Sequence, residues 1–289
     1  MSAEHVCHRD TRRPARQGGR AASRPESSWP APDTMTATNR RPDPHRGSEP
    51  DRTATDVRTA CLLVSARYPE ATGAVLGGSA ARGRPTPSSD LDITVLLPDH
   101  GRRRREVLRY EGRPAEVFLN SRADLRTAFE ESRATRRATA LFLFADSIVL
   151  HDPHGHVGAL RREAEALLAA GPDPLTEPER DAQRALLTDL WDDLTDTGPH
   201  SDPYEQLAMA DKTLREAAHL LTAHHRKWHG AGKWLPRRLS AADPELGRRL
   251  LDGHLALARR ADPGPLSTSV LDVLNLAGGP LREGYVTSR

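Results

Sequence analysis

Two aspartates, Asp90 and Asp92, stand in a segment with the pattern of a β-strand, and they limit the fold more than any other stretch of the chain. From Leu91 to Leu97, Leu, Ile and Val are interspersed with Asp and Thr, and the segment stops at Pro98. Because successive side chains of a strand point to opposite faces, Asp90 and Asp92 point the same way, with Leu91 buried behind them. Two converging carboxylates repel each other when unpaired, so the pair predicts a site for hard divalent cations, Mg²⁺ first among them.

A glycine-rich turn precedes the aspartates. Gly77-Gly78-Ser79 ends a second strand-like segment, Gly73 to Gly77, and ten residues separate Ser79 from Asp90. Missing side chains at Gly77 and Gly78 let a phosphate approach the backbone, and Ser79 can open a short helix whose amides and hydroxyl hold that phosphate. A phosphate cradle facing a metal pair is the minimum equipment for metal-assisted phosphoryl or nucleotidyl transfer.

A third acid is expected on a neighbouring strand. Glu116 stands in the apolar context Ala115-Glu116-Val117-Phe118-Leu119, where it shares a face with Phe118. From that position it can join the two aspartates as a metal ligand or as a general base, and the sequence leaves both roles open. Glu111 is the competing acid, but it lies in a predicted turn.

The rest of the first half predicts a small mixed sheet flanked by helices. Apolar residues recur at helical spacing from Thr53 until the chain reaches Pro69. Two further strands are expected, separated by a Glu111-Gly112-Arg113-Pro114 turn. These strands run from Glu106 to Tyr110 and from Ala115 to Asn120. A helical composition from Ala123 to Arg137 and an apolar run from Leu141 to Leu150 complete this part.

The second half predicts helices only, so the fold class is α+β: a small mixed-sheet domain followed by an all-helical domain. A His151-Asp152-Pro153 turn marks the expected boundary, which gives a first domain at 51–150 and a second at 151–289. Pro and Gly pairs punctuate the helices predicted beyond it. Their ranges are Val157–Ala170, Glu177–Thr195, Tyr204–His224, Glu245–Arg260 and Leu266–Leu276.

The first fifty residues are expected to be a disordered arm. They are rich in Arg, Pro, Ser and Gly and show no apolar periodicity, so ordering them would bury too little apolar surface to offset the lost entropy. The sequence does not decide whether translation starts at Met1 or at Met35.

The charge balance excludes a general nucleic-acid-binding protein. The chain has 42 basic and 40 acidic side chains, a formal net charge of +2, and 4% aromatic residues for stacking on bases. No segment approaches the ~20 apolar residues of a transmembrane helix, and two distant cysteines offer no disulfide framework. We therefore expect a soluble, cytoplasmic protein without a membrane or nucleic-acid partner.

The combination Gly78, Ser79, Asp90, Asp92 and Glu116 resembles the signature of the DNA polymerase beta-like nucleotidyltransferases, especially the bacterial two-domain group that includes aminoglycoside nucleotidyltransferases. The resemblance covers about Thr53 to Leu150. It implies that 51–150 is the nucleotidyltransferase domain and that the helical half lies on the substrate side. It also implies that Ser79 contacts nucleotide phosphates, that the aspartates bind Mg²⁺ and that Glu116 is a ligand or general base. Gly77, Arg82 and Ser89 look like residues that surround the nucleotide in this family.

Lysine is scarce in the chain, because 39 of the 42 basic residues are arginine. All three lysines fall between residues 212 and 233, and a compact ammonium suits the phosphates of a nucleotide. Lys212 and Lys233 are therefore candidates for nucleotide or substrate contacts, with solvated helix faces as the alternative. By contrast, we interpret Arg102 to Arg105 as a solvated hairpin loop, and His151, His154 and His156 as a turn rather than a metal cluster.

The predicted activity is transfer of a nucleoside monophosphate from an NTP, ATP being the first choice, to an acceptor hydroxyl, with Mg²⁺ as cofactor. The acceptor expected is a small molecule such as an aminoglycoside, bound between the two domains. The alternatives are a protein-adenylylating antitoxin-type enzyme and a non-catalytic nucleotide-binding regulator. The sequence gives neither the acceptor, the base preference nor the oligomeric state.

Overall fold

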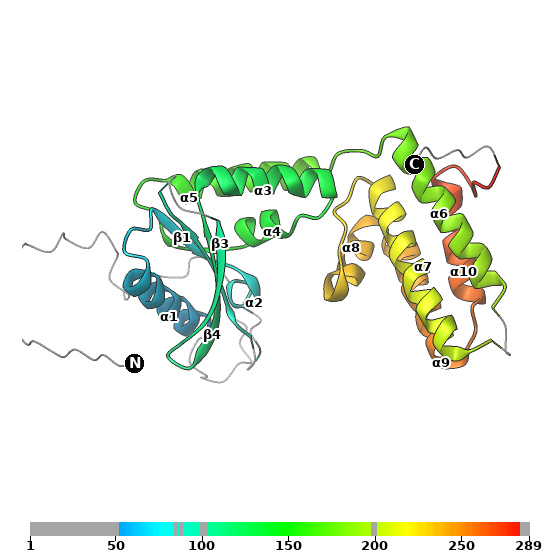
Figure 1. Cartoon of the computed structure of the whole chain (residues 1–289), viewed down its shortest axis with the longest axis horizontal. Coiled ribbons are helices and arrows are strands. Elements are labelled where there is room, and N and C mark those ends of the chain that lie inside the picture. The colour runs from blue at the N-terminus through cyan, green and yellow to red at the C-terminus, as the bar shows by residue number, and fades with distance from the viewer. Residues whose placement is uncertain (1–51, 84–85, 87–88, 99–102, 198–200, 284–289) are drawn as a thin grey trace, which may run out of the picture.

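The computed structural model describes residues 52–83, 86, 89–98, 103–197 and 201–283 (Figure 1). The predictions for the first fifty residues and for a start at Met35 lie outside these ranges. Parts of the segment between Gly83 and Ser89, and Arg102 of the arginine run, lie outside them as well.

A five-stranded mixed sheet forms the first half, as predicted. Its order is β3-β4-β2-β1-β5, in which β2 and β4 run parallel and the other neighbours run antiparallel. The strands are β1 Gly73–Leu76, β2 Leu91–Leu96, β3 Arg104–Tyr110, β4 Arg113–Asn120 and β5 Ile148–His151. Asp92 of β2 lies in register with Glu116 of β4, so the order brings the two predicted acids side by side.

Helices cover both faces of this sheet (Figure 1). Helix α1, Arg52–Arg67, packs on one face and forms an apolar core with the buried residues Leu63, Val64, Ile93, Val95 and Val117. On the other face, a second core joins Val75 and Leu96 of the sheet to the helices α3 Arg122–Thr135, α4 Thr139–Ala145 and α5 His156–Ala170. The apolar run from Leu141 to Leu150 therefore divides between α4 and β5.

The β3–β4 hairpin differs from the prediction in two ways. Its turn has only two residues, Glu111 and Gly112, with φ of 47° and 80°. Positive φ at both positions is favoured in two-residue turns because it matches the twist of the paired strands. Arg113 and Pro114 consequently belong to β4. The prediction that the arginine run is a loop was also wrong for Arg104 and Arg105, which pair with β4 as the first residues of β3.

The remaining chain is helical and has its own apolar core, formed largely by leucines. It contains α6 Glu177–Thr195, α7 Pro203–His224, the 3₁₀ turn η2 Gly232–Trp234, α8 Leu235–Ala242, α9 Pro244–Arg260 and α10 Gly264–Leu276. Sequence reasoning missed η2 and α8, because α8 is short and contributes only Leu235 and Leu239 as buried residues. The limits of the domains stay a prediction, and α5 packs with the sheet half through Val157, Leu160 and Ala164.

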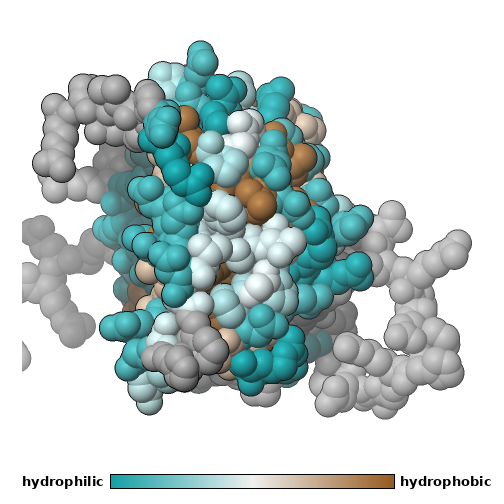
Figure 2. All heavy atoms as spheres, turned by 90° about the vertical axis from the view of Figure 1, so that its right-hand side faces the viewer, coloured by the Kyte–Doolittle hydropathy of each residue, from teal (hydrophilic) through white to brown (hydrophobic). Residues whose placement is uncertain are grey.

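The helical half shows a largely hydrophilic face in Figure 2, with hydrophobic side chains scattered among polar ones. None of the helices in the described ranges is both long and apolar enough to span a bilayer.

Candidate active site

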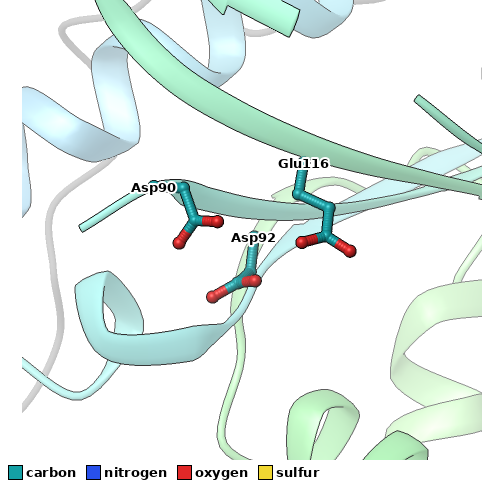
Figure 3. A group of neighbouring side chains, drawn as sticks. All are labelled: Asp90, Asp92 and Glu116. Atoms are coloured by element: carbon teal, nitrogen blue, oxygen red, sulfur yellow. The ribbon is translucent and has the colours of Figure 1, made fainter. Parts of the chain in front are cut away.

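Three carboxylates meet at the sheet surface, as predicted. One oxygen from each of Asp90, Asp92 and Glu116 lies within 4.8 Å of the others, and all three residues are half-buried (Figure 3). Asp90 precedes β2, Asp92 is its second residue, and Glu116 projects from β4 to the same side. Within the described ranges no histidine, including those of the 151–156 segment, takes part in a comparable cluster of three potential ligands.

The carboxylates crowd one another enough to change their chemistry. Burial first, and then the charges of Asp90 and Glu116, raise the pKa of Asp92 to about 6, against the lowering effects of Arg82 and Lys233. Three half-buried carboxylates that repel one another form a donor set that suits a hard divalent cation such as Mg²⁺. The residues present therefore fit the metal that this chemistry requires.

The glycine turn lies directly against Asp92. Gly78 has a φ of 66°, and a Cβ added there would lie 1.7 Å from Oδ2 of Asp92. The amide of Gly77 donates to the carbonyl of Asp92 at 2.7 Å, which fixes the turn to β2. Only a residue without a side chain fits at this point. Ser79, half-buried, follows in the four-residue helix α2, Gly78–Ala81.

Arg82 and Ser89 occupy different environments at the two ends of the intervening segment. Arg82 pairs with Asp146 at 3.6 Å and lies over the ring of Trp234 at 4.8 Å. Ser89 closes a local turn, in which its hydroxyl accepts from the amide of Thr86 at 2.8 Å. The nucleotide contacts assigned to both residues stay predictions.

The candidate lysines differ in position. Lys233, exposed in η2, lies within electrostatic reach of Asp92 and lowers the pKa of that carboxyl. Lys212 is exposed on α7, where its neighbour Asp211 pairs with Arg215. The structure thus gives Lys233 a link to the carboxylates, and the role of Lys212 stays a prediction.

The helical half contributes an arginine and tryptophan cluster next to Lys233. The guanidinium of Arg237 lies 4.7 Å from the centre of the Trp234 ring, and that of Arg238 lies 3.5 Å from the ring of Phe142 in α4. With Arg82 on the same tryptophan, these contacts join α2 and α4 to η2 and α8.

Arg105 is the residue that sequence reasoning missed. Its Nε forms an ion pair with Oε1 of Glu116, although the side chain remains 61% exposed. The sequence did hold a signal for this contact. Arg105 and Val107 are two residues apart and share one face of β3, and Val107 lies directly opposite Glu116. The signal was unreadable without the pairing register of the two strands.

Comparison with known proteins agrees with this geometry. Residues 62–144 match the family model described as "Nucleotidyltransferase domain". These residues form a nucleotidyltransferase domain. The match includes the glycine turn, both aspartates and Glu116, so the acidic cluster is the candidate catalytic centre of the domain.

Two further comparisons add less. The nucleotidyltransferase-like protein from Exiguobacterium sibiricum, known from a crystal structure, is similar at 13% sequence identity with a TM-score of 0.43; the match covers 77% of this chain and 76% of that one. No curated protein matches the chain.

Proposed function

We propose that the chain is a Mg²⁺-dependent nucleotidyltransferase that moves a nucleoside monophosphate from an NTP, ATP being the first candidate, to a hydroxyl of a small acceptor. One observation carries the proposal. The three carboxylates converge within 4.8 Å beside Gly78, inside the matched nucleotidyltransferase domain. Metal-assisted nucleotidyl transfer needs a phosphate-binding turn next to a cluster of acids.

Asp90 and Asp92 are the residues that would hold Mg²⁺, and Glu116 would be a further ligand or the base. When bound, the metal neutralises phosphate charge and lowers the pKa of the acceptor hydroxyl. The acceptor oxygen attacks the α-phosphorus, the bond from that phosphorus to the bridging oxygen breaks, and pyrophosphate leaves. The hydroxyl proton passes to Glu116 or to solvent.

The surrounding residues supply position and charge. The absence of a side chain at Gly78 lets the Asp92 carboxylate lie against the glycine turn, so a phosphate bound by the backbone of that turn would lie next to Asp92. Lys233, whose charge acts on Asp92, is placed to contact the triphosphate, and Arg82 lies between α2 and Trp234. The acceptor reaches the carboxylates from the side that the nucleotide leaves open.

The test is incubation of the full chain with each of the four labelled NTPs, Mg²⁺ and a panel of hydroxylated metabolites and aminoglycosides. We expect pyrophosphate release and an acceptor whose mass rises by one nucleoside monophosphate. Asp90→Asn and Asp92→Asn should abolish both signals while the folded circular-dichroism spectrum remains. If the wild-type chain neither binds nor cleaves any of the four NTPs, the proposal is wrong.

A further inference from the structure

We propose that the acceptor carries a negative charge, as a phosphate or carboxylate group, and that Arg105 binds this group beside Glu116. The inference rests on the proposed function, which it extends from the nucleotide to the second substrate. It departs from the aminoglycoside predicted from the sequence, because aminoglycosides are polycations.

Arg105 is placed to take a second partner. It contacts Glu116 through one guanidinium nitrogen, and the side chain remains 61% exposed. A guanidinium offers five N–H donors in a planar fork that matches phosphate and carboxylate groups. Because Glu116 is expected at the metal, the arginine beside it stays at the edge of the reacting centre with donors to spare.

The opposite side of the carboxylates is already assigned to the nucleotide. Gly78 lies against Asp92, and the charge of Lys233 acts on that same aspartate. Arg82 reaches Trp234 from the end of α2, which closes that side with cationic groups. The triphosphate belongs there, so the acceptor has to approach Glu116 along the β3–β4 hairpin.

The hairpin face next to Glu116 is cationic and partly apolar. In the described residues of this hairpin, Arg105, Val107 and Arg109 share the face of Glu116, because Val107 lies directly opposite Glu116 and strand side chains alternate. Glu106 points to the other face, where Tyr68, the residue after α1, donates to it at 2.8 Å. An acceptor at this position therefore meets two arginines at the edge of the carboxylate cluster.

The same face offers an apolar surface for the carbon skeleton of the acceptor. Val107 is 73% exposed, and the half-buried Phe118 lies in register with Arg105. The acids at this position are the three carboxylates of the cluster, which the proposed function assigns to Mg²⁺, and one of them, Glu116, is also paired with Arg105. A polycation placed here would therefore face Arg105 and Arg109 without a free group of acids. The charge pattern thus selects an anion against a polycation.

The test uses the full chain with Mg²⁺, a cleavable NTP and hydroxyl compounds in three charge classes: sugar phosphates and hydroxy acids, neutral sugars, and aminoglycosides. We expect nucleotidylated products from the anionic class. For that acceptor, Arg105→Gln should raise KM about tenfold or more, the loss of one charge-assisted contact, whereas the KM for NTP should change by less than about twofold. Phosphate and carboxylate compounds are scored separately, which distinguishes the two sources of charge.

Arg104→Gln is the matched control. Arg104 is the preceding residue, is 60% exposed and pairs with Glu106 on the other face, so its loss should leave the acceptor KM unchanged. Transfer to aminoglycosides or neutral sugars in preference to anions would overturn the inference. So would an Arg105→Gln variant that loses kcat alone, because Arg105 would then act only by positioning Glu116.

A binding measurement tests the inference even if none of the compounds in the panel is a substrate. With Mg²⁺ and a non-hydrolysable NTP analogue bound, glycerol 3-phosphate should bind to wild type and the Arg104→Gln variant more tightly than to Arg105→Gln, as followed by NMR. Equal binding, or none, would overturn the inference. If the NTP analogue itself does not bind, the proposed function fails instead, so the two failures are distinguishable.

Discussion

Gly78 brings the glycine turn into direct contact with Asp92, fourteen residues later in the sequence. The sequence predicted a glycine there for the approach of a phosphate, and the structure adds a second reason. Its φ of 66° and the 1.7 Å between an added Cβ and Asp92 both demand glycine. The residue thus couples the glycine turn to the metal-binding strand.

Gly78→Ala should therefore destabilise the fold and impair turnover. The left-handed backbone costs roughly 1–2 kcal/mol for a residue with a Cβ, and the displacement of Asp92 adds to it. Gly112→Ala is the control, because Gly112 has a φ of 80° and nothing within 4 Å of an added Cβ. Chemical denaturation should show a larger loss of stability for Gly78→Ala than for Gly112→Ala. Pyrophosphate release should fall only for Gly78→Ala. Equal stability losses with full activity would mean that Asp92 moves aside freely.

Asp92→Asn should stabilise the metal-free protein. A carboxyl pKa raised to about 6 in the folded state, against about 3.9 unfolded, means that the charged form opposes folding. This cost is fully present above pH 6 and disappears as the pH falls from 6 towards 4. At pH 7.5 without metal, the variant should gain about 1–3 kcal/mol of unfolding free energy.

The gain from Asp92→Asn should vanish near pH 4, and Mg²⁺ should stabilise the wild type more than the variant. Denaturant unfolding at several pH values with and without Mg²⁺ measures both effects. A variant that is less stable than wild type at pH 7.5 without metal would contradict the prediction.

At the residue scale, the sequence predicted that the three acids converge, and it did not predict the arginine beside them. Alternation along a strand suffices to place Asp90 and Asp92 on one surface, and the parallel register of β2 and β4 brings Glu116 to them. Arg105 could be placed only with the register of β3 on β4. That register depends on the two-residue turn at Glu111 and Gly112, whereas the predicted turn had four residues.

At the scale of elements, helices with explicit end signals were predicted almost to the residue. Helix α6 begins with a capping box of Thr176 and Glu179, and α7 and α9 begin after the aspartate caps Asp202 and Asp243. The 3₁₀ turn η2 and α8 carry no such side-chain cap, and both were missed. They are the elements that bring Lys233 and Trp234 towards the sheet half.

Lys233 in η2 should contribute to nucleotide affinity. Removing its charge with Lys233→Gln should weaken Mg²⁺–NTP binding about ten- to a hundredfold, the effect of one lost charge-assisted contact. Lys227→Gln, which removes an exposed lysine beyond the end of α7, is the control and should bind like wild type. Calorimetric titration of the three proteins decides the matter. Lys212→Gln is measured in the same series. If every variant binds Mg²⁺–NTP with unchanged affinity, the phosphate contacts come from the glycine turn and from arginines.

At the scale of the whole molecule, composition predicted the two-part architecture but not how the parts meet. The helical half joins the sheet half through residues that follow α7. Trp228 is buried in the core formed by α3, α4 and α5, and its Nε1 donates to the carbonyl of Leu168 at 3.2 Å. The neighbouring amide of His229 donates to the carbonyl of Arg136 at 2.8 Å. The sequence does not identify these partners, because they lie on α5 and at the end of α3, far from Trp228 along the chain.

The first fifty residues should be dispensable for the proposed chemistry, because the sequence places no motif of the site there. Deletion of Met1 to Pro50 is expected to leave the thermal midpoint and the pyrophosphate release of the full chain unchanged. A large drop in either would assign the arm a structural or catalytic part.

Trp228 should hold the two halves in the arrangement that the active site needs. Its side chain is 6% exposed, so Trp228→Ala leaves a large cavity in the sheet-side core and should lower the unfolding free energy by about 3–5 kcal/mol. Trp234→Ala is the matched comparison. Trp234 is only half-buried and lies beneath Arg82 and Arg237, so its loss should cost about 1 kcal/mol.

The loss of Trp228 should also weaken Mg²⁺–NTP binding in conditions where Trp228→Ala remains folded, because Lys233 follows Trp228 by five residues. Denaturant unfolding and calorimetric titration of both variants test this coupling. A Trp228→Ala protein that loses stability but binds nucleotide like wild type would show that the helical half contributes nothing to the nucleotide site.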